Sequence, residues 1–136
     1  MSPVGKTKDQ GWEIGVRRTF SISPARAWLL LMTQPGLSLW LGQGIEPAFK
    51  KGLVYETTDG TTGDVRSYGE GSFIRLRWQP RGWDTASTLQ VRVLPAKTGT
   101  TISFHQERLQ DGDQREAMRQ HWSTVLDQVG ELFSGG

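Results

Sequence analysis

The chain has 136 residues and no cysteine, and its 16 lysines and arginines stand against 14 aspartates and glutamates, a net charge of +2. This length suits one compact domain with a hydrophobic core, and the lack of thiols excludes disulfides, thiolate metal sites and cysteine nucleophiles. The small net charge, and apolar runs far shorter than the about 20 residues of a membrane span, lead us to expect a cytoplasmic protein that binds neither nucleic acid nor membrane.

The N-terminal part of the chain combines a polar tail with a strand pattern. Residues 1–10 are polar and lack periodicity, which predicts a flexible tail ahead of a single domain over residues 11–134. Apolar and polar side chains alternate over residues 12–22, which predicts a half-buried strand. Arg18 falls among the apolar positions of that strand, where its charge must be paired or reach solvent.

Two short helices are expected after this strand. Ser23 can cap a helix N-terminus, and Pro24 suits the first helical position because it has no N–H to leave unpaired. That helix must end before Pro35. The apolar residues over 35–41 predict a second short helix, ahead of the glycines that follow.

The middle of the chain alternates between strand patterns and glycine turns. Period-two alternation joined by short turns is typical of an antiparallel meander with one face in solvent. The segments that show it are residues 53–56, 73–79, 88–93 and 101–105, and residues 63–68 between two turns are expected to add a further strand. Together with the first strand, they predict a sheet of about six strands.

A long helix is expected at the C-terminus. Asp113 followed by Glu116 has the spacing of a capping box, and apolar residues then recur every three or four positions on one helix face. About 20 residues of helix span roughly 30 Å, enough to cross a sheet. The whole order predicts an α+β fold, in which a curved antiparallel sheet wraps a long C-terminal helix.

Four stretches of the sequence, in their order and spacing, resemble one known family. They are RTFSISPARAWLLLMTQP at residues 18–35, Gly63-x-Val65 through Trp78, Gly99-Thr100-Thr101, and the C-terminal helix with Trp122 and Leu126. The chain is similar here to the activator-of-heat-shock-protein-ninety-ATPase homologue family, within the START/SRPBCC superfamily of helix-grip folds. The resemblance implies a deep cavity between the long helix and the sheet that accepts apolar small molecules.

The aromatic residues are the main candidates for the walls of such a cavity. Six tryptophans in a chain of this length either build a core or line a pocket, because each is large and apolar with one N–H. The inward-facing side chains, with Arg18 to orient a ligand, give the predicted ligand cavity: Arg18, Trp40, Tyr55, Trp78, Leu89, Val91, Phe104, Met118, Trp122 and Val125. Trp83 could lie at the cavity mouth or pack on the surface.

Three functions are compatible with these patterns. The leading hypothesis is a small protein that binds an apolar molecule (lipid-like, aromatic or polyketide-like) in this cavity. The second, suggested by the family name, is a co-chaperone-like interaction module for an Hsp-type ATPase. The third is a cyclase- or dehydratase-type enzyme with His121 or Tyr55 as its acid or base. Because no nucleophile, phosphate-loop or metal-site motif is present, we assign no catalytic residue and expect no cofactor. We expect the protein to be a monomer or a homodimer.

The other face of the sheet is predicted to be basic. The arginines on outward positions are Arg17, Arg66, Arg75, Arg77 and Arg92. We interpret this face as solvated, with cross-strand pairs to nearby acidic residues. The aromatic residues on which single-stranded nucleic acid would stack lie on the opposite face.

Overall fold

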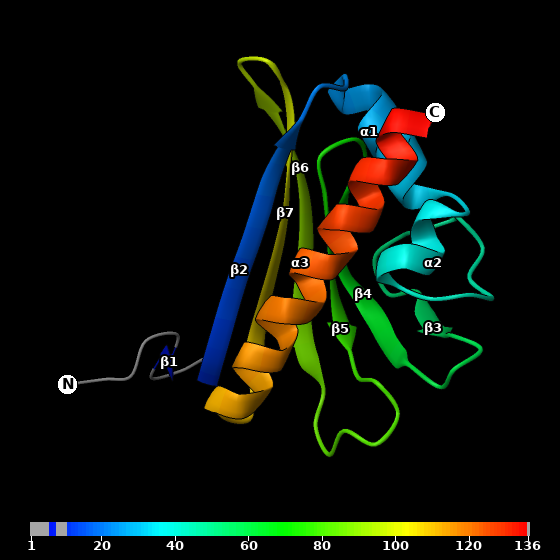
Figure 1. Cartoon of the computed structure of the whole chain (residues 1–136). Coiled ribbons are helices and arrows are strands. Elements are labelled where there is room, and N and C mark those ends of the chain that lie inside the picture. The colour runs from blue at the N-terminus through cyan, green and yellow to red at the C-terminus, as the bar shows by residue number, and fades with distance from the viewer. Residues whose placement is uncertain (1–5, 8–10, 136) are drawn as a thin grey trace.

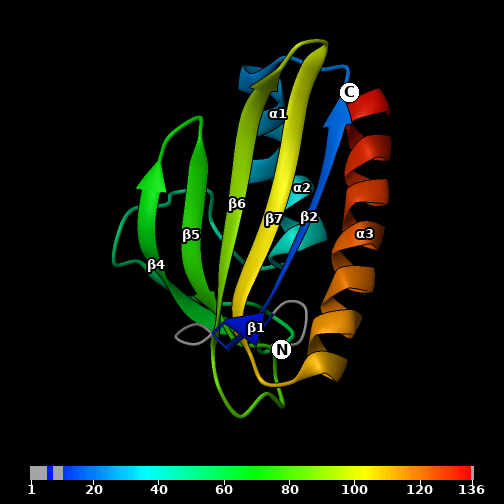
Figure 2. The ribbon, with the colours of Figure 1, turned by 90° about the vertical axis from the view of Figure 1, so that its left-hand side faces the viewer.

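The computed structural model describes residues 6–7 and 11–135. Within them the chain forms a seven-stranded antiparallel sheet, in the order β1-β2-β7-β6-β5-β4-β3, and three helices. The strands are β1 Lys6–Thr7, β2 Gly11–Phe20, β3 Val54–Glu56, β4 Thr62–Gly69, β5 Phe73–Trp78, β6 Ser87–Ala96 and β7 Gly99–Leu109. The helices are α1 Pro24–Met32, α2 Gly36–Trp40 and α3 Gly112–Gly135. Figure 1 shows α3 running along one face of the sheet, and Figure 2 shows the opposite face.

The α+β fold predicted from the sequence is confirmed, with a long C-terminal helix on the sheet and two short helices after the first long strand. All six strands predicted from residue 12 onward are present. The structure adds β1, which pairs with the start of β2 and which the sequence pattern did not predict. The rest of the tail predicted over residues 1–10 lies outside the described residues.

The alternation of side chains explains which face of the sheet is buried. In β5, Ile74, Leu76 and Trp78 are buried, whereas Arg77 between them is exposed on the outer face. Pairing with β6 sets Leu89 opposite Leu76 and continues the buried layer across the sheet. The inner face therefore lies beneath the helices, and the outer face carries the polar side chains.

Local signals place the first helix where the sequence predicted it. Ser23 is the N-cap, and its hydroxyl accepts a hydrogen bond from the backbone N–H of Arg26 at 3.3 Å. Pro24 takes the first helical position, where a missing N–H has no cost. The helix ends at Met32, ahead of the Pro35 that was expected to limit it.

The long helix α3 begins earlier than the sequence pattern predicted. Asp111 accepts a hydrogen bond from the N–H of Gln114 at 2.7 Å, and the Gln114 side chain accepts one from the N–H of Gln110 at 2.8 Å. These contacts satisfy N–H groups that a helix start leaves without partners. The predicted capping box of Asp113 and Glu116 is therefore wrong, and Glu116 instead forms an ion pair one turn further along the helix.

The core lies between α3 and the inner face of the sheet (Figure 1). The helix contributes Trp122, Val125, Leu126 and Val129, all buried. The short helices α1 and α2 close the core on the same face, and both contact α3. The sequence analysis placed the ligand cavity in this layer.

Candidate functional site

A continuous chain of aromatic rings runs from a surface loop into the core. Trp83, in the loop between β5 and β6, meets Trp78 edge to face, with ring centres 5.6 Å apart. Trp78 lies 5.4 Å from Trp122 of α3, which stacks on Phe104 of β7 at 4.7 Å with an interplanar angle of 10°. Trp40 of α2 extends the chain, 6.5 Å from Phe104. Four elements and one loop therefore converge on a single aromatic cluster.

The indole N–H groups of this cluster differ in whether they are hydrogen bonded. Trp40 Nε1 donates to the Leu31 carbonyl at 2.8 Å, and Trp122 Nε1 donates to Gln106 Oε1 at 2.8 Å. Trp78 Nε1 is buried and has no hydrogen-bond partner in the described part of the chain. A buried donor without a partner costs about 1–3 kcal/mol of stability, which sets the indole of Trp78 apart from those of Trp40 and Trp122.

A buried polar bridge holds the inner side of the cluster. Gln106 Nε2 donates to Ser87 Oγ at 2.9 Å, and the Ser87 hydroxyl donates to the Trp78 carbonyl at 2.7 Å. With the indole of Trp122 donating to Gln106, these bonds link α3, β7, β6 and β5. Paired polar groups in a core fix one arrangement of the side chains around them, so the bridge holds the cluster in register.

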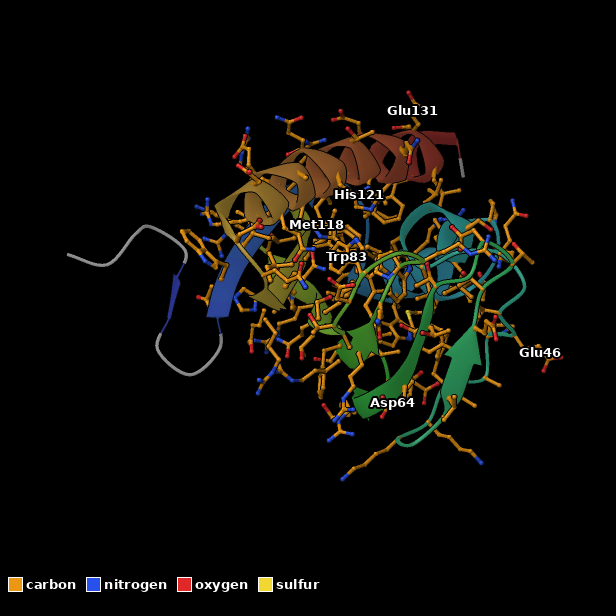
Figure 3. All side chains as sticks on the ribbon, turned by 90° about the horizontal axis from the view of Figure 1, so that it is seen from below. Glu46, Asp64, Trp83, Met118, His121 and Glu131 are labelled. Carbon is orange, nitrogen blue, oxygen red and sulfur yellow. The ribbon has the colours of Figure 1, made fainter. Side chains whose placement is uncertain are left out.

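One end of the cluster reaches the surface beside α3. Figure 3 shows Met118 and His121 on the side of α3 that faces Trp83. The His121 ring lies 6.1 Å from the Trp78 ring and 4.6 Å from the Trp122 ring. Met118 and Trp83 are partly buried against the core. We call these residues, Trp78, Trp83, Met118, His121 and Trp122, the aromatic site.

Desolvation sets the protonation of His121. The residue keeps exposed surface, but packing against the neighbouring rings lowers the pKa of its imidazole below the ordinary value of 6.5. A neutral imidazole has one N–H donor and one acceptor nitrogen. At neutral pH the five residues of the aromatic site therefore carry no formal charge.

Apart from Tyr55, the other residues predicted to contact a ligand fall into two groups. Those buried in the core around the aromatic site are Trp40, Leu89, Val91, Phe104 and Val125. Arg18 lies apart from them, between β2 and α3, where its Nη1 pairs with Asp127 Oδ1 at 2.5 Å. Both partners of this ion pair reach solvent. Ligand contact by any of these side chains stays a prediction.

Tyr55 is buried on β3 with its hydroxyl already hydrogen bonded. The phenol donates to the Arg77 carbonyl at 2.5 Å. Burial, with a smaller contribution from the charge of Asp64, raises the pKa of the phenol. The Tyr55 hydroxyl therefore keeps its proton and uses it in this bond. Of the two acid–base candidates from the sequence, Tyr55 and His121, only His121 lies in the aromatic site.

Gln106 and Ser87 are residues of the site that the sequence analysis missed. Gln106 shares the inward parity of Ile102 and Phe104 in β7. A polar residue on a buried strand face requires a hydrogen-bond partner inside the protein, and that parity was the available signal. Ser87 opens β6, where no pattern distinguishes it from the preceding loop.

Two kinds of site are not found where the structure describes the chain. Over residues 6–7 and 11–135, no group of three or more histidines or carboxylates is placed to hold a metal ion. None of the helices there combines the length and the hydropathy needed to cross a bilayer.

Comparison at the sequence level connects the chain to one family. The sequence model of the family described as "Activator of Hsp90 ATPase homolog 1-like protein" matches residues 21–134. A comparison with the sequences of curated proteins finds no match. The matched range extends from the end of β2 almost to the end of α3.

Solved structures share the architecture of the chain. Protein MLL2253 of Mesorhizobium loti has 22% identity and a TM-score of 0.71, over 90% of this chain and 96% of that one. Protein PFC0360w of Plasmodium falciparum, described as an HSP90 activator, has 17% identity and a TM-score of 0.75, over 91% and 97%. The Aha1 dimer of Colwellia psychrerythraea has 15% identity and a TM-score of 0.71, over 89% and 95%. At these identities the likeness establishes the fold alone.

Proposed function

The chain belongs to the family of Activator of Hsp90 ATPase homolog 1-like proteins, and from this premise we propose that it binds a small aromatic molecule at the aromatic site. The ligand would lie between α3 and the loop of residues 79–86, against Trp78, Trp83 and His121. Burial among apolar rings would supply affinity, and one hydrogen bond would orient the ligand. The proposal narrows the apolar ligand expected from the sequence to an aromatic one with a hydrogen-bond acceptor.

The observation that carries the proposal is the unpaired indole N–H of Trp78. The buried indoles of Trp40 and Trp122 both have protein acceptors at 2.8 Å, so the unpaired group is an exception within its own cluster. A carbonyl or ether oxygen on a ligand would accept this bond and recover about 1–3 kcal/mol. A hydrocarbon of the same shape would not.

The rings around Trp78 support an aromatic ligand rather than a lipid chain. The ring contacts of Trp78 with Trp83, His121 and Trp122 span 5.4–6.1 Å and include edge-to-face and tilted geometries. Such contacts contribute about 0.5–1.5 kcal/mol each beyond the burial of area. The flexible thioether of Met118 can adjust to the shape of an incoming ring.

Access to the aromatic site would depend on the loop of residues 79–86. Trp83 is held there by two hydrogen bonds, from Gln79 Nε2 to its carbonyl at 2.7 Å and from its N–H to the Pro80 carbonyl at 3.1 Å. Residues 80–86 form no strand, so an outward movement of Trp83 breaks few backbone bonds. That movement would bring Trp78 within reach of a ligand.

Two probe molecules of nearly equal size test the proposal. 1-Acetonaphthone carries a carbonyl acceptor, and 1-ethylnaphthalene replaces it with a hydrocarbon. In ¹⁵N-labelled protein, the ketone should shift the indole signal of Trp78, assigned through Trp78→Phe. It should also bind about tenfold more tightly than the hydrocarbon. Trp78→Phe should abolish that preference and retain binding of the naphthalene ring.

Trp28→Phe is the matched control. Trp28 of α1 packs against Tyr68 of β4, with ring centres 5.9 Å apart, so its replacement should leave both affinities unchanged. The proposal fails if neither probe binds, if the two bind equally to the unaltered protein, or if the ketone shifts the indole of Trp28 instead of that of Trp78.

A second candidate is interaction with an Hsp-type ATPase. The family description and the similarity to a protein described as an HSP90 activator favour it. The purified chain should then bind a purified Hsp90-type chaperone in a pull-down and raise its ATPase rate. Absence of both effects at saturating concentration removes this candidate, and it leaves the ligand proposal untouched.

A further inference from the structure

A hollow of about 560 Å³ lies on the outer face of the sheet, and Ser87 in its lining is the residue that donates to the Trp78 carbonyl. Figure 2 views the sheet from this side. Four arginines line the hollow, Arg66, Arg75, Arg77 and Arg108, and its remaining lining residues are the small Ala86, Ser87 and Thr88. Long basic side chains around a floor of small residues form a polar depression, in contrast to the apolar interior.

Two irregularities in strand pairing help to build the hollow. Between Val65 and Ser67 the register of β4 against β5 shifts, which makes Arg66 an extra residue on β4. A second shift affects β7 next to the start of β2, and there Arg108 has a φ of 63°. Bulges turn side chains away from the regular alternation of a strand. The bulge on β4 therefore supplies Arg66, and the bulge on β7 supplies Arg108. The two arginines lie on opposite sides of the small residues at the start of β6.

The acidic neighbours neutralise only part of this charge. Arg66 Nη1 and Arg77 Nε share one carboxylate, that of Asp64, at 3.2 and 3.8 Å. Arg75 Nη2 lies 3.3 Å from Glu107 Oε2. Arg108 forms no ion pair with a carboxylate in the described residues. Four guanidinium groups therefore face two carboxylates around one depression.

We infer that this hollow binds a phosphate group, carried by a small organic phosphate or by a lipid head group. A guanidinium presents several N–H donors in a planar fork that matches phosphate oxygens. Single-nitrogen contacts to Asp64 leave further donors of Arg66 and Arg77 available. A tetrahedral dianion carries more charge than a carboxylate and directs its acceptor oxygens in three dimensions, so it can accept from more of these guanidinium groups at once. This inference is independent of the aromatic site.

The shape and surroundings of the hollow favour a small phosphate over a nucleic acid. Its volume lies in the range of small-molecule sites, roughly 300–1,000 Å³. Binding of single strands relies on aromatic rings interleaved with cations, and the tryptophans of the cluster are on the inner face. The occupant expected is a molecule with one phosphate or a short polyphosphate.

Calorimetric titration with inorganic tripolyphosphate tests the inference. The unaltered protein should bind the probe, and affinity should fall as salt is added. The double variant Arg77→Gln with Arg108→Gln should weaken binding about tenfold or more. The control, Arg17→Gln with Arg92→Gln, removes the same charge from exposed outer-face positions that do not line the hollow. It should change affinity by less than about twofold.

Removal of the competing carboxylate gives a test in the opposite direction. Asp64→Asn releases Arg66 and Arg77, and it should tighten tripolyphosphate binding severalfold. Glu131→Gln changes the net charge equally on the far side of the molecule, on α3 (Figure 3), and it should have no effect. Equal gains in the two variants would mean that net charge alone governs binding, and they would overturn the inference.

The remaining outcomes are also decisive. Absence of tripolyphosphate binding, or equal losses in the two double variants, overturns the inference. Binding of a polyglutamate peptide more tightly than tripolyphosphate overturns the assignment to phosphate. A lipid head group is supported if the unaltered protein and the control variant sediment with phosphatidic acid vesicles and the variant Arg77→Gln with Arg108→Gln does not. A soluble phosphate is supported if the protein binds tripolyphosphate but not the vesicles. The hollow variants should leave the binding of 1-acetonaphthone unchanged, which separates the two proposals.

Discussion

At the scale of single residues, His121 couples the aromatic site to pH. Burial lowers the pKa of its imidazole in the folded protein below 6.5, while the unfolded chain takes up the proton near the ordinary value. Above pH 6.5 both states are neutral, and the contribution to stability is complete. Below it the unfolded state binds more protons, so the free energy of unfolding should fall as the pH drops.

Urea unfolding across this pH range measures the effect. His121→Gln cannot titrate, and it should remove part of the loss of stability below pH 6.5. His105→Gln, a histidine replacement on the outer face, should retain the part due to His121. An NMR titration in which the His121 imidazole protonates at or above pH 6.5 would contradict the prediction.

Gly63 is a residue whose lack of a side chain is required by packing. A Cβ there would collide with the carbonyl oxygen of Arg77 and with the hydroxyl of Tyr55, which are themselves joined by a hydrogen bond. Gly63→Ala should lower the free energy of unfolding by roughly 3 kcal/mol. Gly135→Ala, where nothing lies within 4 Å, should change it little, and equal midpoints of urea unfolding in the two variants would refute this account.

Several residues of the candidate site could be predicted from parity, and others could not. Alternation placed Trp78 and Phe104 on the inner face, and helical spacing placed Trp122 opposite them. Gln106 has the same parity, but alternation of apolar residues does not distinguish a buried polar residue from an exposed one. The partner that each indole finds depends on side-chain geometry, which no spacing in the sequence contains.

At the scale of elements, two aspartates near the start of α3, Asp111 and Asp113, are candidates for its N-cap. Asp111 makes the capping contact, with the N–H of Gln114 at 2.7 Å, whereas Asp113 lies in the first turn. Asp111→Ala should cost about 1 kcal/mol of unfolding free energy. Asp113→Ala should cost less, because only its interaction with the helix dipole is lost. Chemical denaturation of the two variants decides, and the reverse order would restore the cap predicted from the sequence.

The strands themselves were predictable, but their irregularities were not. Period-two alternation identified β7, where most side chains keep an inside–outside order, whereas in β4 Val65 alone is buried and the alternation is weak. An inserted residue such as Arg66 or Arg108 shifts the pairing without leaving a mark in the apolar pattern. The arginine hollow therefore became visible only when the paired register was known.

At the scale of the whole molecule, Trp122 joins the helix α3 to the inner face of the sheet. It stacks on Phe104 and donates to Gln106. Trp122→Ala should cost about 3–5 kcal/mol. Trp122→Phe keeps a ring but leaves Gln106 Oε1 without this donor, and it should cost about 1–3 kcal/mol. Trp83→Phe, in the partly buried loop position, should cost less than either. Urea unfolding would contradict this if the two Trp122 variants lost equal stability.

The overall architecture followed from the order of the patterns, whereas the state of the interior did not. One apolar stripe on α3 and one apolar face on each strand can be buried only against each other. Whether those side chains enclose space or touch depends on their volumes and rotamers in three dimensions. In the structure the rings of Trp78, Trp122 and Phe104 contact one another, and the sequence allowed both outcomes.

The two outermost strands of the sheet are its shortest, β1 with two residues and β3 with three. Because β1 pairs with Gly11 and Trp12 alone, most of the ten-residue β2 has no strand partner among the described residues on the side away from β7. Long exposed edges invite continuous intermolecular sheets and fibril growth. A second copy that paired along this part of β2 would extend the sheet, so a homodimer formed in that way should share one continuous sheet.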